Sequence, residues 1–123
     1  MDSETPAAAR EPWPWPDSLD ALAAAPRHHS LRFENERVRV LETIIAPGDN
    51  VPLHTHRWPG VYHVLGWSDF IRRDAEGNVL FDSRTRPAPP AAPFVQWSEP
   101  LPPHTVENIG SAATHILSVE LKD

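Results

Sequence analysis

Hydrophobic and polar positions alternate in short runs along most of the chain, a pattern typical of half-buried β-strands. The run over residues 37–45 is rich in β-branched side chains, which pack well on a pleated sheet. Similar runs predict further strands over residues 51–56, 61–70, 79–81, 94–97, 104–108 and 114–121. Turn-forming residues separate them at 47–50, 74–78, 87–93 and 100–103. Many short strands at this spacing predict an all-β sandwich or barrel.

Residues 1–29 follow a different pattern. Prolines alternate with tryptophans over residues 12–16 and predict an extended arm, because proline cannot enter the interior of a helix or a sheet. Asp17 is expected to cap a short helix that ends before Pro26. We therefore expect an N-terminal arm with a short helix over 1–29 and a β-barrel over 30–123. The tryptophans predict an arm that lies on the barrel or on a second subunit, and a free, solvent-exposed arm is the alternative.

Composition narrows the classes of function. The 123 residues carry 11 Lys and Arg against 17 Asp and Glu, and this acidic balance argues against nucleic acid or a membrane surface as a partner. The absence of cysteine excludes disulfides, thiolate metal sites and cysteine nucleophiles. No run approaches the ~20 apolar residues of a membrane helix. The first residues lack the pattern of a secretory signal, so we expect a cytoplasmic protein.

The candidate chemistry centres on two histidines of the strand predicted over residues 51–56. Side chains alternate along a strand, so His54 and His56 point to the same face. Two imidazoles placed in this way can bind one metal ion, and the alternative is a pair of surface or hydrogen-bonded histidines. The sequence contains no nucleophile elbow, phosphate-binding loop or dinucleotide fingerprint. The pair His28-His29 is interpreted as a surface feature of the linker, with metal binding as the remote alternative.

Two motifs in sequence order carry a family resemblance. Gly48 precedes His54 and His56 with the spacing Gly-x5-His-x-His, and Asn108 follows His104 with the spacing His-x-x-x-Asn. The chain resembles the cupin superfamily over residues 31–122. The resemblance implies a double-stranded β-helix, or jelly-roll barrel, with a metal ion in its wider mouth. It also implies that His54, His56 and His104 bind the metal, and that Asn108 supports the site or the adjacent turn.

One departure from the family pattern leaves the site open to interpretation. The family's glutamate ligand falls at Gly60 or Val61, and neither can bind a metal through its side chain. The site can be a three-histidine site, as in the thiol dioxygenases of the superfamily, or it can lack a metal. A third possibility is that another side chain completes it. The candidates for this role are Tyr62, His63, Glu42, Glu107 and His115.

Strand parity ranks the side chains around the site. Tyr62 shares the face of position 60, which makes it the candidate catalytic residue: a phenol near the metal that can hydrogen-bond a substrate. Its alternative is an ordinary core aromatic. His115 is expected to point inward with the apolar residues of the last strand, and Glu107 is expected to face solvent. Pocket walls are expected from Trp58, Phe70, Phe94 and Trp97, unless these are plain core residues.

The ligand types also limit the metal and the substrate. Imidazole nitrogens suit a divalent transition metal, with iron or zinc expected first and manganese or nickel as alternatives. Neutral ligands leave the 2+ charge uncompensated, which favours a small polar or anionic substrate. We expect a metal-dependent dioxygenase or a Lewis-acid enzyme. The alternatives are a non-enzymatic small-molecule-binding cupin and an interaction protein that uses the N-terminal arm. Exposed sheet edges favour a homodimer.

Overall fold

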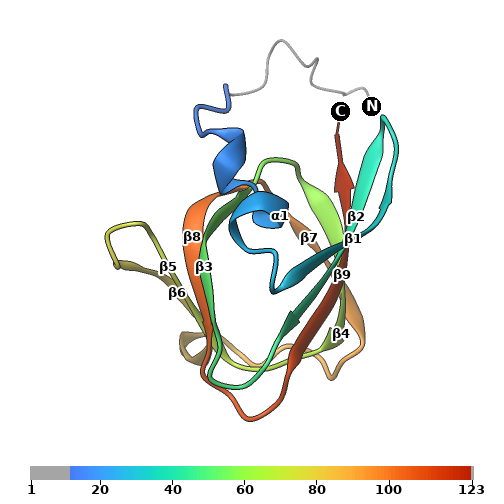
Figure 1. Ribbon diagram of the computed structural model, residues 1–123. Helices are drawn as coiled ribbons and strands as arrows, with labels where there is room; N and C mark the ends of the chain where they lie inside the picture. The colour runs from blue at the N-terminus through green and yellow to red at the C-terminus, as the bar shows by residue number, and fades with distance from the viewer. Residues whose placement is uncertain (1–11, 123) are drawn as a thin grey trace.

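Two antiparallel sheets face each other and form a barrel in the computed structural model, which describes residues 12–122 (Figure 1). The strands of the first sheet lie in the order β1 (His29–Glu34), β2 (Val38–Ile45), β9 (Thr114–Leu121), β4 (Gly60–Gly66) and β7 (Phe94–Ser98). Those of the second sheet lie in the order β3 (Asn50–His56), β8 (Leu101–Asn108), β5 (Phe70–Arg73) and β6 (Val79–Asp82). The all-β, double-sheet architecture predicted from the sequence is confirmed.

Short helices flank the strands: the 3-10 helix η2 (Asp17–Leu19) and α1 (Ala21–Ala24) precede the barrel, and the 3-10 helix η3 (Ser83–Thr85) follows β6. The predicted cap at Asp17 is wrong. Asp20 caps α1 instead, because its carboxylate accepts a hydrogen bond of 3.0 Å from the backbone nitrogen of Leu22. No helix within residues 12–122 is long and apolar enough to cross a membrane. Part of the predicted arm, residues 1–11, lies outside the described residues, and the division of the chain at residue 29 remains a prediction.

Two strand boundaries differ from the predicted ones. The single strand predicted over residues 61–70 is divided into β4 and β5. The turn predicted over residues 100–103 is the start of β8, which contains Pro102 and Pro103. Proline cannot donate a ladder hydrogen bond, but β5 pairs with β8 only from Thr105 onward. The prolines therefore enter the strand where no bond to β5 is required.

The interior of the barrel is unusually polar. Among the described residues, fourteen polar or charged side chains are buried against seven hydrophobic ones. On β9 the buried positions are Thr114, Ser118 and Glu120. Buried polar groups need hydrogen-bonding partners or a ligand, so the barrel interior is the place to look for a functional site.

Candidate metal centre

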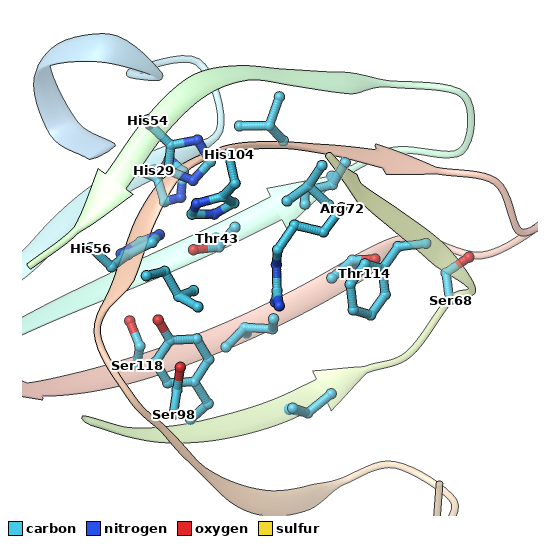
Figure 2. Close-up of a pocket in the computed structure, with 18 of the residues that line it drawn as sticks. His29, Thr43, His54, His56, Ser68, Arg72, Ser98, His104, Thr114 and Ser118 are labelled. Carbon is cyan, nitrogen blue, oxygen red and sulfur yellow. The ribbon is translucent and has the colours of Figure 1, made fainter. Parts of the chain in front are cut away.

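Four histidine rings meet inside the barrel from three strands. His54 and His56 lie on β3, His104 lies on β8, and His29 is the first residue of β1. The ring centroid of His54 lies 4.3 Å from that of His104, 5.1 Å from that of His56 and 4.9 Å from that of His29 (Figure 2). All four side chains are buried. The fold thus brings together imidazoles that are far apart in the sequence.

His54 and His104 are held by the same local device. They are register partners on neighbouring strands, and each follows a proline by two residues. Nδ1 of His54 donates a hydrogen bond of 2.7 Å to the carbonyl oxygen of Pro52, and Nδ1 of His104 donates one of 2.7 Å to that of Pro102. A carbonyl only accepts, so each Nδ1 carries the proton and each Nε2 keeps a free lone pair.

His29 and His56 are also held through Nδ1. His29 donates a hydrogen bond of 3.0 Å to the carbonyl oxygen of Ala25, just after α1. His56 lies 2.9 Å from Oε2 of Glu120, an acceptor when ionised. In the described part of the chain, no hydrogen bond engages Nε2 of any of the four rings. Outer hydrogen bonds of this type fix the orientation of metal-binding histidines and raise their basicity as ligands.

Burial keeps three of these rings neutral. It is the largest cause that lowers the pKa of His29 to about 4, of His104 to about 3 and of His54 to about 2. Repulsion between neighbouring imidazolium charges lowers these pKa values further. The neutral form is the one that binds metals. The rings are therefore in the ligand form at neutral pH.

The donor set fits a divalent transition metal. Ligand nitrogens of His29, His54 and His56 lie within 4.8 Å of one another. Three nitrogens bound to one ion at about 2.0–2.1 Å are at most about 3.6 Å from one another, so shifts of less than about 1 Å in each ring would bring all three to one ion. His104, a ligand expected from the sequence, lies outside this group of three but packs directly against His54.

His29 is the member of the cluster that sequence reasoning missed. The interpretation of His28-His29 as a surface pair is wrong, since the two residues are only 6% and 5% exposed. His28 lies 3.4 Å from a carboxylate oxygen of Asp49. His29 pairs with Thr43 of β2, which directs its ring into the barrel. No local motif marks this position, because it depends on the pairing of β1 with β2.

A buried carboxylate, that of Glu120, contacts the Nδ1 side of one histidine of the cluster. Glu120 is 0% exposed, and its Oε1 accepts a hydrogen bond of 2.8 Å from Nε of Arg39 while its Oε2 lies against His56. Arg39 in turn donates two hydrogen bonds, of 2.9 and 2.8 Å, to the carboxylate of Asp20. This chain of contacts connects the N-cap of α1 with an imidazole of the cluster.

The same region shows why no side chain fits at Gly60, one of the two positions where the family pattern has its glutamate. Gly60 is the register partner of Glu120, and a Cβ atom at position 60 would lie 2.5 Å from the carbonyl oxygen of Val119. A side chain at this position would clash with the backbone of β9. The carboxylate that contacts the cluster comes from the facing position on β9, where Glu120 lies against His56.

Next to the histidines lies a cavity of about 110 Å3. Tyr62 lines it, with its ring centroid 6.4 Å from that of His56. Burial and the negative charge of Glu120 raise the pKa of the Tyr62 phenol, so the hydroxyl stays protonated and can donate a hydrogen bond. Phe70 also lines the cavity, whereas Phe94 is outside the set of lining residues.

Asn108, unlike Tyr62, is not among the residues that line the cavity. It is buried, and its amide nitrogen donates hydrogen bonds of 2.9 Å to the carbonyl oxygens of Ile45 and Ala112. Its amide oxygen accepts from Ser68 and from the backbone of Gly110. Of the two expected roles, these contacts match support of the adjacent turn.

Three other candidates lie away from the cavity, contrary to the sequence-based expectation. His115 points outward, with Nε2 2.6 Å from Oε2 of Glu42. Trp97 is 53% exposed, and Trp58 lies outside the cavity with its ring 4.9 Å from the Arg39 guanidinium carbon. The expectation for His115 assumed that the apolar side of the last strand faces inward. On β9 the side with Thr114, Ser118 and Glu120 faces inward, so His115 on the opposite side faces outward.

Comparisons with known proteins place this geometry in a structural context. No protein-family model matches the sequence, and no curated protein matches it. Among solved structures, a cupin domain from Bordetella pertussis Tohama I has a TM-score of 0.57 and 19% sequence identity, with 77% of this chain and 92% of that chain covered. An RmlC-like cupin from Methanocaldococcus jannaschii has a TM-score of 0.52 and 10% identity, covering 76% and 77%.

A third structure, a protein with a double-stranded β-helix domain from Klebsiella pneumoniae, has a TM-score of 0.51 and 18% identity, with 76% and 70% of the two chains covered. At this level of identity, structural likeness shows the fold, and function must be argued from the site. The three structures are, by their own descriptions, a cupin domain, a protein with a double-stranded β-helix domain and a double-stranded β-helix cupin, and this chain has two facing antiparallel sheets. The chain has the double-stranded β-helix fold of the cupin superfamily.

Proposed function

We propose that His29, His54, His56 and His104 bind one divalent transition metal through Nε2, and that the protein acts on a small molecule in the adjacent cavity. The observation that carries the proposal is the shared arrangement of the rings. Each Nδ1 is held by the protein and each Nε2 is left free. A metal bound here would supply a Lewis acid, or a centre for dioxygenase chemistry if the metal is iron.

The chain's own residues have defined tasks in this proposal. Glu120 orients the ring of His56 and keeps its Nε2 directed away from the hydrogen-bonded side. Tyr62 offers a protonated hydroxyl at the cavity wall, which can hydrogen-bond a bound ligand. A cavity needs a volume of about 10–15 Å3 to hold a single water molecule. A cavity of about 110 Å3 therefore suits a small molecule and excludes a polymer.

Metal analysis of the purified protein tests the proposal. We expect about one transition-metal ion per chain in the native protein, and iron and zinc are the metals to measure first. His54→Asn and His56→Asn should remove the bound metal, whereas His115→Asn on the outer face should retain it. A native protein that retains no metal after loading with iron, zinc, manganese or nickel would refute the proposal.

Assays of substrate turnover distinguish a metal-dependent enzyme from a non-enzymatic binding protein that has the same metal centre. Oxygen uptake with thiols, diketones and amino acids would identify a dioxygenase. Substrate loss without oxygen uptake would identify Lewis-acid chemistry. A metal-loaded protein that binds small molecules and turns none over would favour the non-enzymatic alternative.

The predicted homodimer remains a prediction with a defined candidate surface. Ile44, Val61, Val95 and Trp97 are exposed apolar side chains of the five-stranded sheet, and their strand positions alternate with inward-facing ones. Exposed apolar patches of this kind often mark association surfaces. Light scattering of the native protein and of Trp97→Ser would test the dimer. The cytoplasmic location also remains a prediction.

A further inference from the structure

The cavity contains a cation, Arg72, that has no acidic or hydrogen-bonding partner among the described residues. Arg72 extends from β5 into the interior, where it lines the same cavity as the histidines (Figure 2). Within residues 12–122 its guanidinium forms no hydrogen bond or ion pair, and its buried Nε is left without an acceptor. Its neighbour Arg73 donates a hydrogen bond of 2.8 Å to Glu107. Two consecutive arginines on one strand thus have opposite environments.

In the described part of the chain, no carboxylate balances Arg72 inside the cavity. None of the lining residues is Asp or Glu. The aromatic rings of Phe70 and Phe81, with centroids 5.6 and 5.8 Å from the guanidinium carbon, give only weak compensation for a charge. Burial lowers the pKa of Arg72, yet an arginine keeps its charge at neutral pH. A buried cation with unpaired donors is costly unless a ligand supplies the acceptor.

A second polar atom of the cavity also has no hydrogen-bonding partner within residues 12–122. Oγ1 of Thr114 is buried without a hydrogen bond, and Thr114 lines the cavity from β9. A hydroxyl adds a donor that can serve the same ligand group as a guanidinium. A planar guanidinium matches the two oxygens of a carboxylate by paired, parallel hydrogen bonds.

We propose that Arg72 binds the carboxylate of a small organic acid, so that the ligand lies between Arg72 and the histidine cluster. This inference rests on the proposed function for the histidine end of the ligand and names its substrate class. Carboxylate binding by Arg72 itself does not need a metal. The assignment makes Arg72 the residue that selects an acid over its neutral analogue.

Titration of the metal-free protein with propionate and with the neutral propionamide tests the inference. Two-dimensional 15N–1H NMR gives the dissociation constants and reports on the Arg72 Nε–H signal, which is identified by its loss in Arg72→Gln. We expect propionate to bind about 10- to 100-fold more tightly than propionamide, as charge-assisted hydrogen bonds predict. Propionate should also shift the Arg72 Nε–H signal.

Matched variants locate the effect. Arg73→Gln changes the next residue on the same strand and should keep the preference for propionate. Arg72→Gln should abolish it, and Arg72→Lys should weaken it because an ammonium cannot form the paired hydrogen bonds. Equal affinities for acid and amide in the native protein, or an unchanged preference in Arg72→Gln, would overturn the inference. If Arg72→Gln does not fold, an Nε–H signal (then identified in Arg72→Lys) that propionate leaves unmoved would overturn it equally.

Metal content of the same samples, measured after loading, keeps the two proposals apart. Protein that binds no metal but retains an Arg72-dependent preference for propionate would refute the metal centre and support the inference. Protein that binds one metal ion but shows no preference would refute the inference and leave the metal centre supported.

Discussion

Replacement of Glu120 should lower the metal affinity of the protein while the protein still folds. Glu120→Gln keeps the size of the side chain but replaces a pure acceptor by an amide with one acceptor and one donor. The carboxylate serves both Arg39, at 2.8 Å, and His56, at 2.9 Å. The amide oxygen can accept from only one of these partners in the same geometry, so the amide nitrogen must face the other.

The loss in the free energy of unfolding on Glu120→Gln depends on which hydrogen bonds the amide can keep. Arg39 keeps its two hydrogen bonds to Asp20, so its charge remains paired. One hydrogen bond involving a charged group is lost, which corresponds to about 1.5–3 kcal/mol in the free energy of unfolding. If the amide nitrogen donates to Nδ1 of His56, the ring's proton moves to Nε2, where it blocks metal binding. Loss of an outer-shell partner of this kind lowers metal affinity by about 10- to 100-fold.

Competition with a chromophoric chelator measures the metal affinity, and urea denaturation followed by circular dichroism measures the stability. Glu42→Gln is the matched control, because Glu42 makes the same contact with a histidine, His115, at 2.6 Å on the outer face. The control should leave metal affinity unchanged and lower stability less than Glu120→Gln does, because water screens ion pairs at the surface. A folded Glu120→Gln protein whose metal affinity is within twofold of the native value would refute the role assigned to Glu120.

Three further predictions concern the same interior. The depressed pKa values of the cluster histidines mean that only the unfolded chain binds these protons between about pH 6.5 and pH 4. The metal-free protein should therefore be most stable above about pH 6.5 and lose about 1.4 kcal/mol per pH unit per histidine below it. Equal urea midpoints at pH 7 and pH 5 would contradict this. Gly60→Ala should cost about 1–3 kcal/mol because of the close approach to β9, whereas Val61→Ala, at an exposed position, should cost less. Equal losses for the two variants would argue against the clash. Arg72→Met should raise the thermal midpoint, since it removes a half-buried cation whose buried Nε has no acceptor among the described residues; the expected gain is about 1 kcal/mol. A lower midpoint would show that Arg72 has a structural role.

Local sequence patterns were sufficient to predict the site residues that belong to a short motif on a single strand. The alternation of side chains placed His54 and His56 on one face, and both are buried in the barrel. The second motif led to His104, which the register of β8 sets opposite His54. Alternation could place His54 and His56 because a strand fixes the direction of its own side chains, whereas His104 came from the family motif. That these residues bind a metal stays a prediction.

Two residues of the site depend on contacts that no short pattern contains. His29 enters the barrel only through the pairing of β1 with β2. Glu120 was missed because alternation gives the period of a strand but not which side faces inward. The apolar side of the last strand was expected to face the core. In this barrel exposed apolar residues such as Ile44 and Val95 lie on the outside, while Glu120 is buried.

X-ray absorption spectroscopy of the zinc-loaded protein would show whether the four histidines bind one ion. We expect imidazole nitrogens at about 2.0–2.1 Å from the ion, with one fewer imidazole in His29→Asn and an unchanged spectrum in His115→Asn. A spectrum dominated by oxygen ligands, or one that His29→Asn leaves unaltered, would contradict this expectation.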